Sequence, residues 1–134
     1  MVWQLACYDA DRYAGFVALA GTLRRPQKTD TCPGGPVDLL HIHGYRDDQV
    51  PLEGRGIRDW HQGDVWEAMD RLRGRMACRS NPDSIETDGP FWCRNWSDSC
   101  DDGSLTFCLH NGGHGLPAGW GDLAREMFER PAPG

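Results

Sequence analysis

The sequence predicts an α/β fold with parallel strands flanked by helices. Two continuous apolar runs, 16–21 (FVALAG) and 37–43 (VDLLHIH), have the composition of strands that are buried on both faces of a sheet. A third run, 105–110 (LTFCLH), comes later in the chain. A segment with helical periodicity separates the second run from the third. Alternation of strands and helices is typical of sheets whose neighbouring strands are parallel.

The first half of the chain is expected to contain one helix and two strands. Residues 1–13 are predicted to be helical, although no capping side chain stands at the start. The strand 16–21 follows and ends at a glycine. Residues 22–36 form a basic connection rich in Pro and Gly, and the strand 37–43 is stopped by Gly44.

The second half is expected to contain a helix at 60–75, a long loop, a strand and a last helix. Asp64 and Glu67 form a start that resembles a capping box, and four apolar side chains of this helix share one stripe: Val65, Met69, Leu72 and Met76. The polar segment 79–103 is interpreted as a loop held by cysteines, and 105–110 as a strand.

The last helix is expected to be capped by Asp122 and ended by Pro131. Its inward side chains would be Leu123, Met127 and Phe128.

Length and charge limit the possible functions. A chain of 134 residues suffices for one domain with a modest core. A net charge of -6 and a pI near 5.2 argue against nucleic acid or an anionic membrane as partner, because both would repel the protein. No apolar run approaches the roughly 20 residues of a membrane-spanning helix, and Met1 is not followed by a signal peptide pattern.

The chain has six widely and irregularly spaced cysteines: Cys7, Cys32, Cys78, Cys93, Cys100 and Cys108. This pattern predicts disulfides, and therefore a secreted, extracellular or periplasmic protein. Zinc ligands would more often come as C-x-x-C pairs, which are absent. Six cysteines leave about 15 pairings open. Export without a signal peptide in these residues suggests that an N-terminal portion precedes them.

The candidate catalytic residues are Asp47 and His114. Asp47 follows the second strand after the Gly44 turn, and His114 follows the third strand in an Asn111-Gly112-Gly113-His114 turn. A carboxylate placed there can orient an imidazole, and the imidazole can move a proton to and from a nucleophile. Carboxylate and then histidine is the order of the last two triad members in α/β-hydrolases. No G-x-S-x-G motif precedes Asp47.

Other interpretations compete with this one. Taken singly, Asp47 or Asp48 is more often a solvated turn carboxylate, and His114 a surface histidine. A zinc site is a second possibility, with ligands among His41, His43, His110, His114 and Cys108. Four tryptophans offer a platform for a sugar or an aromatic acyl group, although core packing is the commoner role: Trp60, Trp92, Trp96 and Trp120. The acidic cluster Asp98, Asp101 and Asp102 lacks the ligand spacing of a calcium loop.

The loops 43–51 (HGYRDDQVP) and 112–114 (GGH), with Pro117, resemble the acid and histidine loops of the polyhydroxybutyrate depolymerase and feruloyl esterase group of extracellular α/β-hydrolases. The opening residues 1–7 (MVWQLAC) and 11–16 (DRYAGF) are similar to the helix and strand just after the nucleophile turn of that group. The resemblance covers nearly the whole chain. It matches only about the C-terminal half of the family's domain.

The resemblance implies the C-terminal part of a secreted serine esterase that needs no cofactor. Asp47 would be the triad acid and His114 the triad base. The serine and the oxyanion hole would lie before Met1, in a missing N-terminal half, so this chain alone would be inactive. The substrate would be a polyester or a plant polysaccharide ester. The alternatives of a non-catalytic hydrolase-like module and a small zinc domain remain open.

The resemblance also bears on details of the chain. It favours a disulfide between Cys78 and Cys100, which leaves Cys7–Cys32 and Cys93–Cys108 as plausible pairs. Leu116 departs from the family, which often has Trp at this position. None of the five serines stands in a nucleophile turn: Ser80, Ser84, Ser97, Ser99 and Ser104. Strand 16–21 would lack a neighbour on one edge, so we expect poor solubility without an N-terminal partner.

Overall fold

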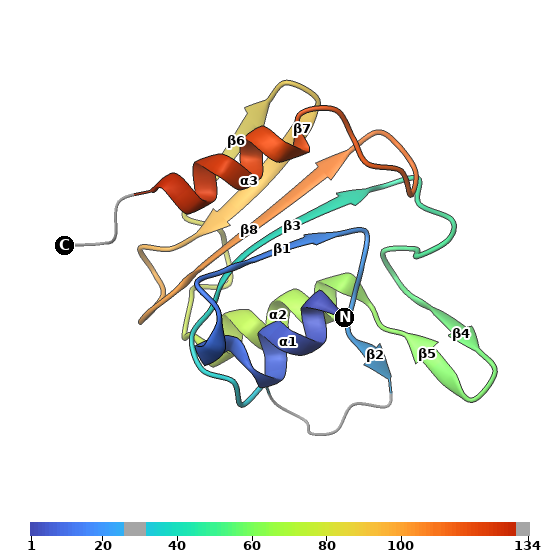
Figure 1. Ribbon diagram of the computed structural model, residues 1–134, viewed down its shortest axis with the longest axis horizontal. Helices are drawn as coiled ribbons and strands as arrows, with labels where there is room; N and C mark the ends of the chain where they lie inside the picture. Colours follow the sequence, from blue (N-terminus) through green and yellow to red (C-terminus); the bar gives the residue numbers. More distant parts are fainter. Residues whose placement is uncertain (26–31, 131–134) are drawn as a thin grey trace.

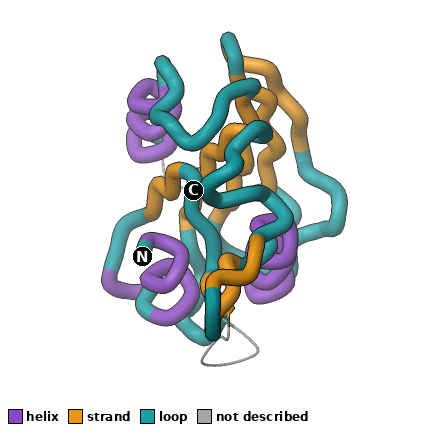
Figure 2. The backbone as a smooth tube through the Cα atoms, turned by 90° about the vertical axis from the view of Figure 1, so that its right-hand side faces the viewer, coloured by secondary structure: helices purple, strands orange, loops and turns teal. Residues whose placement is uncertain are grey.

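A computed structural model describes residues 1–25 and 32–130. Its centre is a five-stranded mixed sheet in the order β1-β3-β8-β7-β6, with α1 and α2 on one face and α3 on the other (Figure 1). The strands of this sheet are β1 (Phe16–Leu19), β3 (Asp38–Gly44), β6 (Ser84–Asp88), β7 (Phe91–Trp96) and β8 (Ser104–His110). The helices are α1 (Val2–Tyr8), α2 (Val65–Arg75) and α3 (Trp120–Glu129). The same layers are visible from the side in Figure 2.

Three strands form the parallel part of the sheet, as the sequence predicts. β3 pairs in parallel with β1 on one side and with β8 on the other. Residues 39–44 of β3 are all buried, which explains the continuous apolar run in the sequence. Because parallel strands end at one edge of a sheet, the loops after β3 and β8 emerge side by side. β1 is the edge strand, as expected.

The prediction of a loop at 79–103 is wrong in its central part. Residues 84–96 form the antiparallel hairpin β6–β7, and β7 also pairs antiparallel with β8. The hairpin turns at Gly89, which has a left-handed φ of 56°. β7 is half exposed, with Phe91 and Cys93 buried on one face and Trp92 exposed on the other. Because polar and apolar residues are mixed in this segment, its composition is typical of a loop.

The predicted start of the helix at 60–75 is also wrong. Residues 60–62 are not helical but form strand β5 (Trp60–Gln62), in a small sheet with β2 (Arg24–Arg25) and β4 (Arg55–Ile57). The helix α2 begins at Val65, where the Asp64 carboxylate accepts the N–H bonds of Trp66 and Glu67. The predicted apolar stripe of this helix is buried.

The first and last helices differ from the prediction as well. The helix α1 ends at Tyr8, and a 3₁₀ turn (Ala10–Arg12) follows it. The helix α3 begins at Trp120, with Gly119 rather than Asp122 as its N-cap. Leu123 and Met127 pack on the sheet, but Phe128 is 55% exposed. Pro131 lies outside the described residues.

The structure contains the three disulfides Cys7–Cys32, Cys78–Cys100 and Cys93–Cys108. The last of these joins residues that lie directly opposite each other on β7 and β8. Three disulfides in a small domain indicate an oxidising environment. In the described ranges, no helix has the length and apolar character needed to cross a bilayer.

We predict that replacing both Cys78 and Cys100 by Ala lowers the free energy of unfolding by about 3 kcal/mol. The bond closes a loop with a sequence separation of 22 residues, so its loss gives the unfolded chain more freedom. Urea denaturation of the variant, with the other two disulfides intact, measures this change. A difference below about 1 kcal/mol would contradict this prediction, because it would mean that segment 79–99 stays restricted in the unfolded chain without the bond.

Candidate active site

Asp47 is fixed within the loop that follows β3. Its Oδ1 accepts the backbone N–H bonds of Gln49 (2.9 Å) and Val50 (2.8 Å), and its own N–H donates to the carbonyl of Gly44 (3.0 Å). The residue is only 5% exposed. Two backbone donors on one oxygen leave the second carboxylate oxygen free to bind another group.

His114 comes from the loop that follows β8. The N–H of Gly112 donates to Nδ1 of His110 at 3.1 Å, so the buried His110 shapes the first turn of this loop. Burial lowers the pKa of His110, although nearby Asp47 raises it. The side chain of His114 is 37% exposed and therefore open to reacting groups.

The two candidate residues are in direct contact, although 67 residues separate them in the chain. Nδ1 of His114 lies 2.8 Å from Oδ2 of Asp47. An ionised carboxylate only accepts hydrogen bonds, so Nδ1 carries the proton and donates. Nε2 is then an acceptor, and it has no hydrogen-bond partner in the described part of the chain. This is the tautomer that a general base requires.

The surroundings of Asp47 favour its ionised form. Burial raises the pKa of Asp47, but hydrogen bonds from the Val50 N–H, His114 and the Gln49 N–H together outweigh this effect. The net pKa lies below the ordinary carboxyl value. Asp47 is therefore a carboxylate at neutral pH and can stabilise an imidazolium on His114.

The close approach of the two loops requires glycine at position 44. A Cβ built on Gly44 would collide with the carbonyl oxygens of Gly112 and Gly113. The N–H of Arg46 donates to the carbonyl of Gly112 at 3.1 Å, and that of Tyr45 to the carbonyl of His110 at 2.9 Å. Contacts between backbone atoms alone thus join the acid and histidine loops.

A chain of hydrogen bonds inside the molecule leads from α1 to the Asp47 loop. Nε1 of Trp3 donates to Nδ1 of His41 at 3.1 Å. Since an indole is only a donor, the proton of His41 lies on Nε2, which donates to Nδ1 of His43 at 3.0 Å. His43 then donates through Nε2 to the carbonyl of Val50 at 2.7 Å. The three hydrogen bonds therefore run in one donor-to-acceptor direction, from Trp3 to the carbonyl of Val50.

His41 and His43, the two histidines in this series of hydrogen bonds, are both neutral. Burial, and then the neighbouring His43, lower the pKa of His41 well below its ordinary value. Burial also lowers the pKa of His43, and this outweighs the opposing effects of the Val50 carbonyl and Asp47. The hydrogen-bond series from Trp3 to Val50 therefore supports the Val50 backbone, whose N–H donates to Asp47, and it places no positive charge beside the carboxylate.

The five residues of the alternative zinc site do not form a metal site in the described part of the chain. Cys108 is in a disulfide, and His41 and His43 use their ring nitrogens for the hydrogen-bond chain. No group of three or more potential ligands occurs within residues 1–25 and 32–130. The Trp3 donor that explains the tautomers of His41 and His43 was not foreseen from the sequence.

Three of the described serines make side-chain hydrogen bonds away from His114. Ser104 stands at the start of β8, at the opposite end of the strand from His110, and donates to Asp38 at 2.9 Å. Ser84 accepts from Asn95, and Ser99 accepts from the Arg79 N–H. No hydrogen bond joins a described serine to His114. The structure thus brings together two residues of the expected triad.

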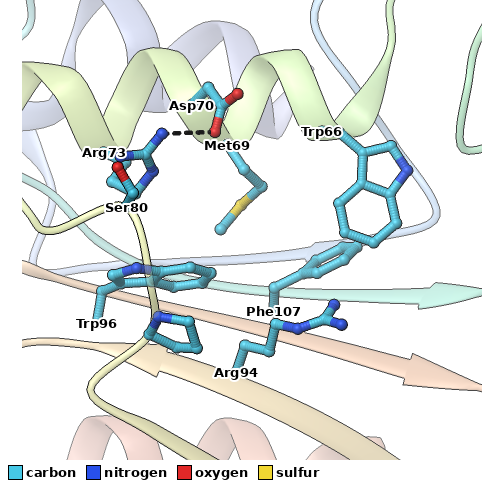
Figure 3. A pocket seen from close by; sticks show the side chains of 9 residues that line it. Trp66, Met69, Asp70, Arg73, Ser80, Arg94, Trp96 and Phe107 are labelled. Carbon is cyan, nitrogen blue, oxygen red and sulfur yellow. Dashed lines mark hydrogen bonds and ion pairs between the residues drawn. The ribbon is translucent and has the colours of Figure 1, made fainter.

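The four tryptophans considered as a possible platform lie apart from one another in different surroundings. Trp60 lies under the guanidinium of Arg24, with 4.3 Å from Cζ to the ring centroid, and lines a groove of about 810 Å³ that reaches Val50. Trp96 lines a separate pocket of about 310 Å³ (Figure 3). Trp92 is exposed, and Trp120 packs at the start of α3. Neither cavity is lined by Asp47 or His114.

Comparison with known proteins gives no assignment: no protein-family model matches this chain, and no curated protein matches it. The functional interpretation therefore depends on the geometry of the site.

We predict that Gly44→Ala separates Asp47 from His114 and lowers the free energy of unfolding by about 1–3 kcal/mol, because the added methyl group overpacks the loop contact. The far-downfield proton NMR signal of a carboxylate-bound imidazole N–H should be present in the parent chain and absent in the variant. Gly113→Ala is the matched control, since its Cβ would meet only the Arg46 carbonyl at 3.9 Å. An unchanged signal in Gly44→Ala would contradict the steric argument.

We predict a pH-dependent stability difference between the parent chain and Asp47→Asn. A depressed folded-state pKa adds stability above the ordinary carboxyl pKa of about 4, and this stability is lost as the pH falls through the folded value. The difference should be about 1.5–3 kcal/mol near neutral pH and should approach zero in strong acid. Urea denaturation across this range measures it. A difference independent of pH would mean that Asp47 is not held ionised.

Proposed function

We propose that this chain carries the acid and the base of a serine-type carboxylic ester hydrolase. The observation that supports this most is the 2.8 Å contact between Oδ2 of Asp47 and Nδ1 of His114. The two groups come from loops at the carboxyl ends of adjacent parallel strands, where open α/β sheets place catalytic residues. The free Nε2 of His114 is the atom that would act on a nucleophile.

The proposed reaction proceeds through an acyl-serine intermediate. Nε2 of His114 takes the proton of a serine hydroxyl as its oxygen attacks the ester carbonyl, and then gives that proton to the leaving alkoxide. A water molecule, activated by the same nitrogen, releases the acid in the second half. Asp47 keeps the imidazole oriented and stabilises its cationic form in each step.

The nucleophile of this reaction would come from a segment outside these 134 residues. No described serine is hydrogen-bonded to His114, and the family resemblance places the serine shortly before Met1. In Figure 1 the start of α1 lies on the same side of the molecule as the ends of β3 and β8. The groove of about 810 Å³ extends from Met1 to Val50, so it opens next to the Asp47 loop.

The same proposal covers fold family, substrate and location. The parallel strands β1, β3 and β8, with helices on both faces, agree with the C-terminal part of an α/β-hydrolase, and the hairpin β6–β7 extends that sheet. The substrate class would be polyester or plant polysaccharide esters. The three disulfides support a secreted enzyme.

We predict that a fluorophosphonate probe does not label the 134-residue chain, because the nucleophile is absent. The chain expressed together with its upstream coding sequence should be labelled at one serine. In that longer protein, His114→Ala should reduce ester hydrolysis by at least about 1,000-fold. His61→Ala, in the small sheet, is the matched control and should retain activity.

Specific labelling of the 134-residue chain would contradict the proposal that the nucleophilic serine lies outside these residues. Absence of labelling in the longer protein would favour a non-catalytic module instead.

A further inference from the structure

A second pocket lies between α2 and the strands β7 and β8, apart from Asp47 and His114. It has a volume of about 310 Å³, at the lower end of the range for small-molecule sites. Figure 3 shows Trp66 and Met69 on α2 facing Arg94 and Trp96 on β7, with Phe107 of β8 between them. The pocket is built entirely from described elements of this chain.

The walls of the pocket are apolar and aromatic. Met69, Trp96 and Phe107 are buried. Trp66 is 39% exposed, and its ring meets that of Phe107 edge to face with 5.0 Å between the centroids. An indole that is held in place but partly open to water offers a ready flat surface for another ring.

The strand register shows that this part of the sheet face lacks a helical cover. Ile85 pairs with Arg94, so both side chains point to the same face as Trp92 and Trp96. Ile85 is 68% exposed and Trp92 is 52% exposed. This part of the sheet face is therefore open to water beside the pocket.

The charges at the pocket distinguish its two arginines. Arg73 is paired with Asp70 at 2.8 Å. Arg94, by contrast, has no carboxylate within 4.0 Å among residues 1–25 and 32–130, and its Cζ lies 5.7 Å from the centroid of the Trp66 ring. An unpaired guanidinium beside an aromatic wall, in a protein with a net charge of -6, has the chemistry to bind an anion with a flat apolar body.

A disulfide and backbone hydrogen bonds hold the rim of the pocket before any ligand binds. Ser80 and Pro82 line it and lie shortly after Cys78, which is bonded to Cys100. Asp83 accepts the N–H bonds of Ser97 and Ser99 at 2.8 and 3.1 Å. A rim that is ordered before binding reduces the entropy lost when a ligand enters.

We propose that this pocket binds small aromatic carboxylates. The ring would lie against Trp66, Met69 and Trp96, and the carboxylate would pair with the guanidinium of Arg94. The site is independent of the proposed hydrolase reaction, because it uses neither Asp47 nor His114 and its sheet residues come from β7 and β8 rather than from the edge strand β1.

Isothermal titration of the 134-residue chain with 2-naphthoate and with neutral 2-naphthalenemethanol tests this proposal. We expect one saturable site for naphthoate and at least about tenfold weaker binding of the alcohol, since a charged hydrogen bond is lost. Arg94→Gln should weaken naphthoate binding to the level of the alcohol, and Trp66→Leu should weaken both. Circular dichroism confirms that the variants are folded.

Two matched variants separate the pocket from the rest of the surface. Trp92→Gln lies on the same sheet face but outside the pocket lining, and Arg125→Gln removes an exposed charge on α3. Both should bind naphthoate like the parent chain. Equal affinity for acid and alcohol, no loss in Arg94→Gln, an equal loss in Trp92→Gln, or no saturable binding would each overturn the proposal.

Discussion

The approach of two backbone segments at Gly44 is the constraint on which the candidate active site depends. Parallel pairing of β3 with β8 brings their carboxyl ends together, and the missing side chain of Gly44 lets the loops touch. Backbone hydrogen bonds from Tyr45 and Arg46 to the second loop then fix their relative position. The 2.8 Å contact between Asp47 and His114 follows from this arrangement. A pair of loops joined by side chains alone would orient the imidazole less firmly.

The buried polar groups beneath the site have a related structural role. His41 and His43 are fully buried, where a polar atom without a partner would cost about 1–3 kcal/mol. Each ring nitrogen has a partner instead, in a series that begins at Trp3 and ends at Val50. Because both rings are neutral, the series adds no net charge next to Asp47. It connects the first helix to the loop that bears the carboxylate, so the packing of α1 contributes to the geometry of the site.

The sequence was sufficient to predict the parallel strands and the two loops that carry Asp47 and His114, but not the antiparallel additions. The runs 16–21, 37–43 and 105–110 are apolar throughout because both faces of those strands are covered, and this signal is strong. β7 has one exposed face, so its alternation of Phe91, Trp92 and Cys93 was hidden in a polar segment.

The site details beyond Asp47 and His114 depend on contacts that sequence patterns do not encode. The clash that excludes a side chain at Gly44 involves residues about 70 positions later in the chain. The tautomers of His41 and His43 depend on Trp3, which belongs to another element. The free guanidinium of Arg94 is recognisable only once the ion pairs of its neighbours are known.

The ring tautomer of His114 shows most directly whether Asp47 prepares this histidine as a base, and it can be read from nitrogen-15 NMR shifts of the 134-residue chain at a pH where the ring is neutral. We predict a proton on Nδ1 and none on Nε2, together with Nε2-protonated rings at His41 and His43. Asp47→Asn provides the reference in which the carboxylate is removed and the preference at His114 should weaken. A proton on Nε2 of His114 in the parent chain would contradict the central claim that Asp47 prepares this histidine as a base.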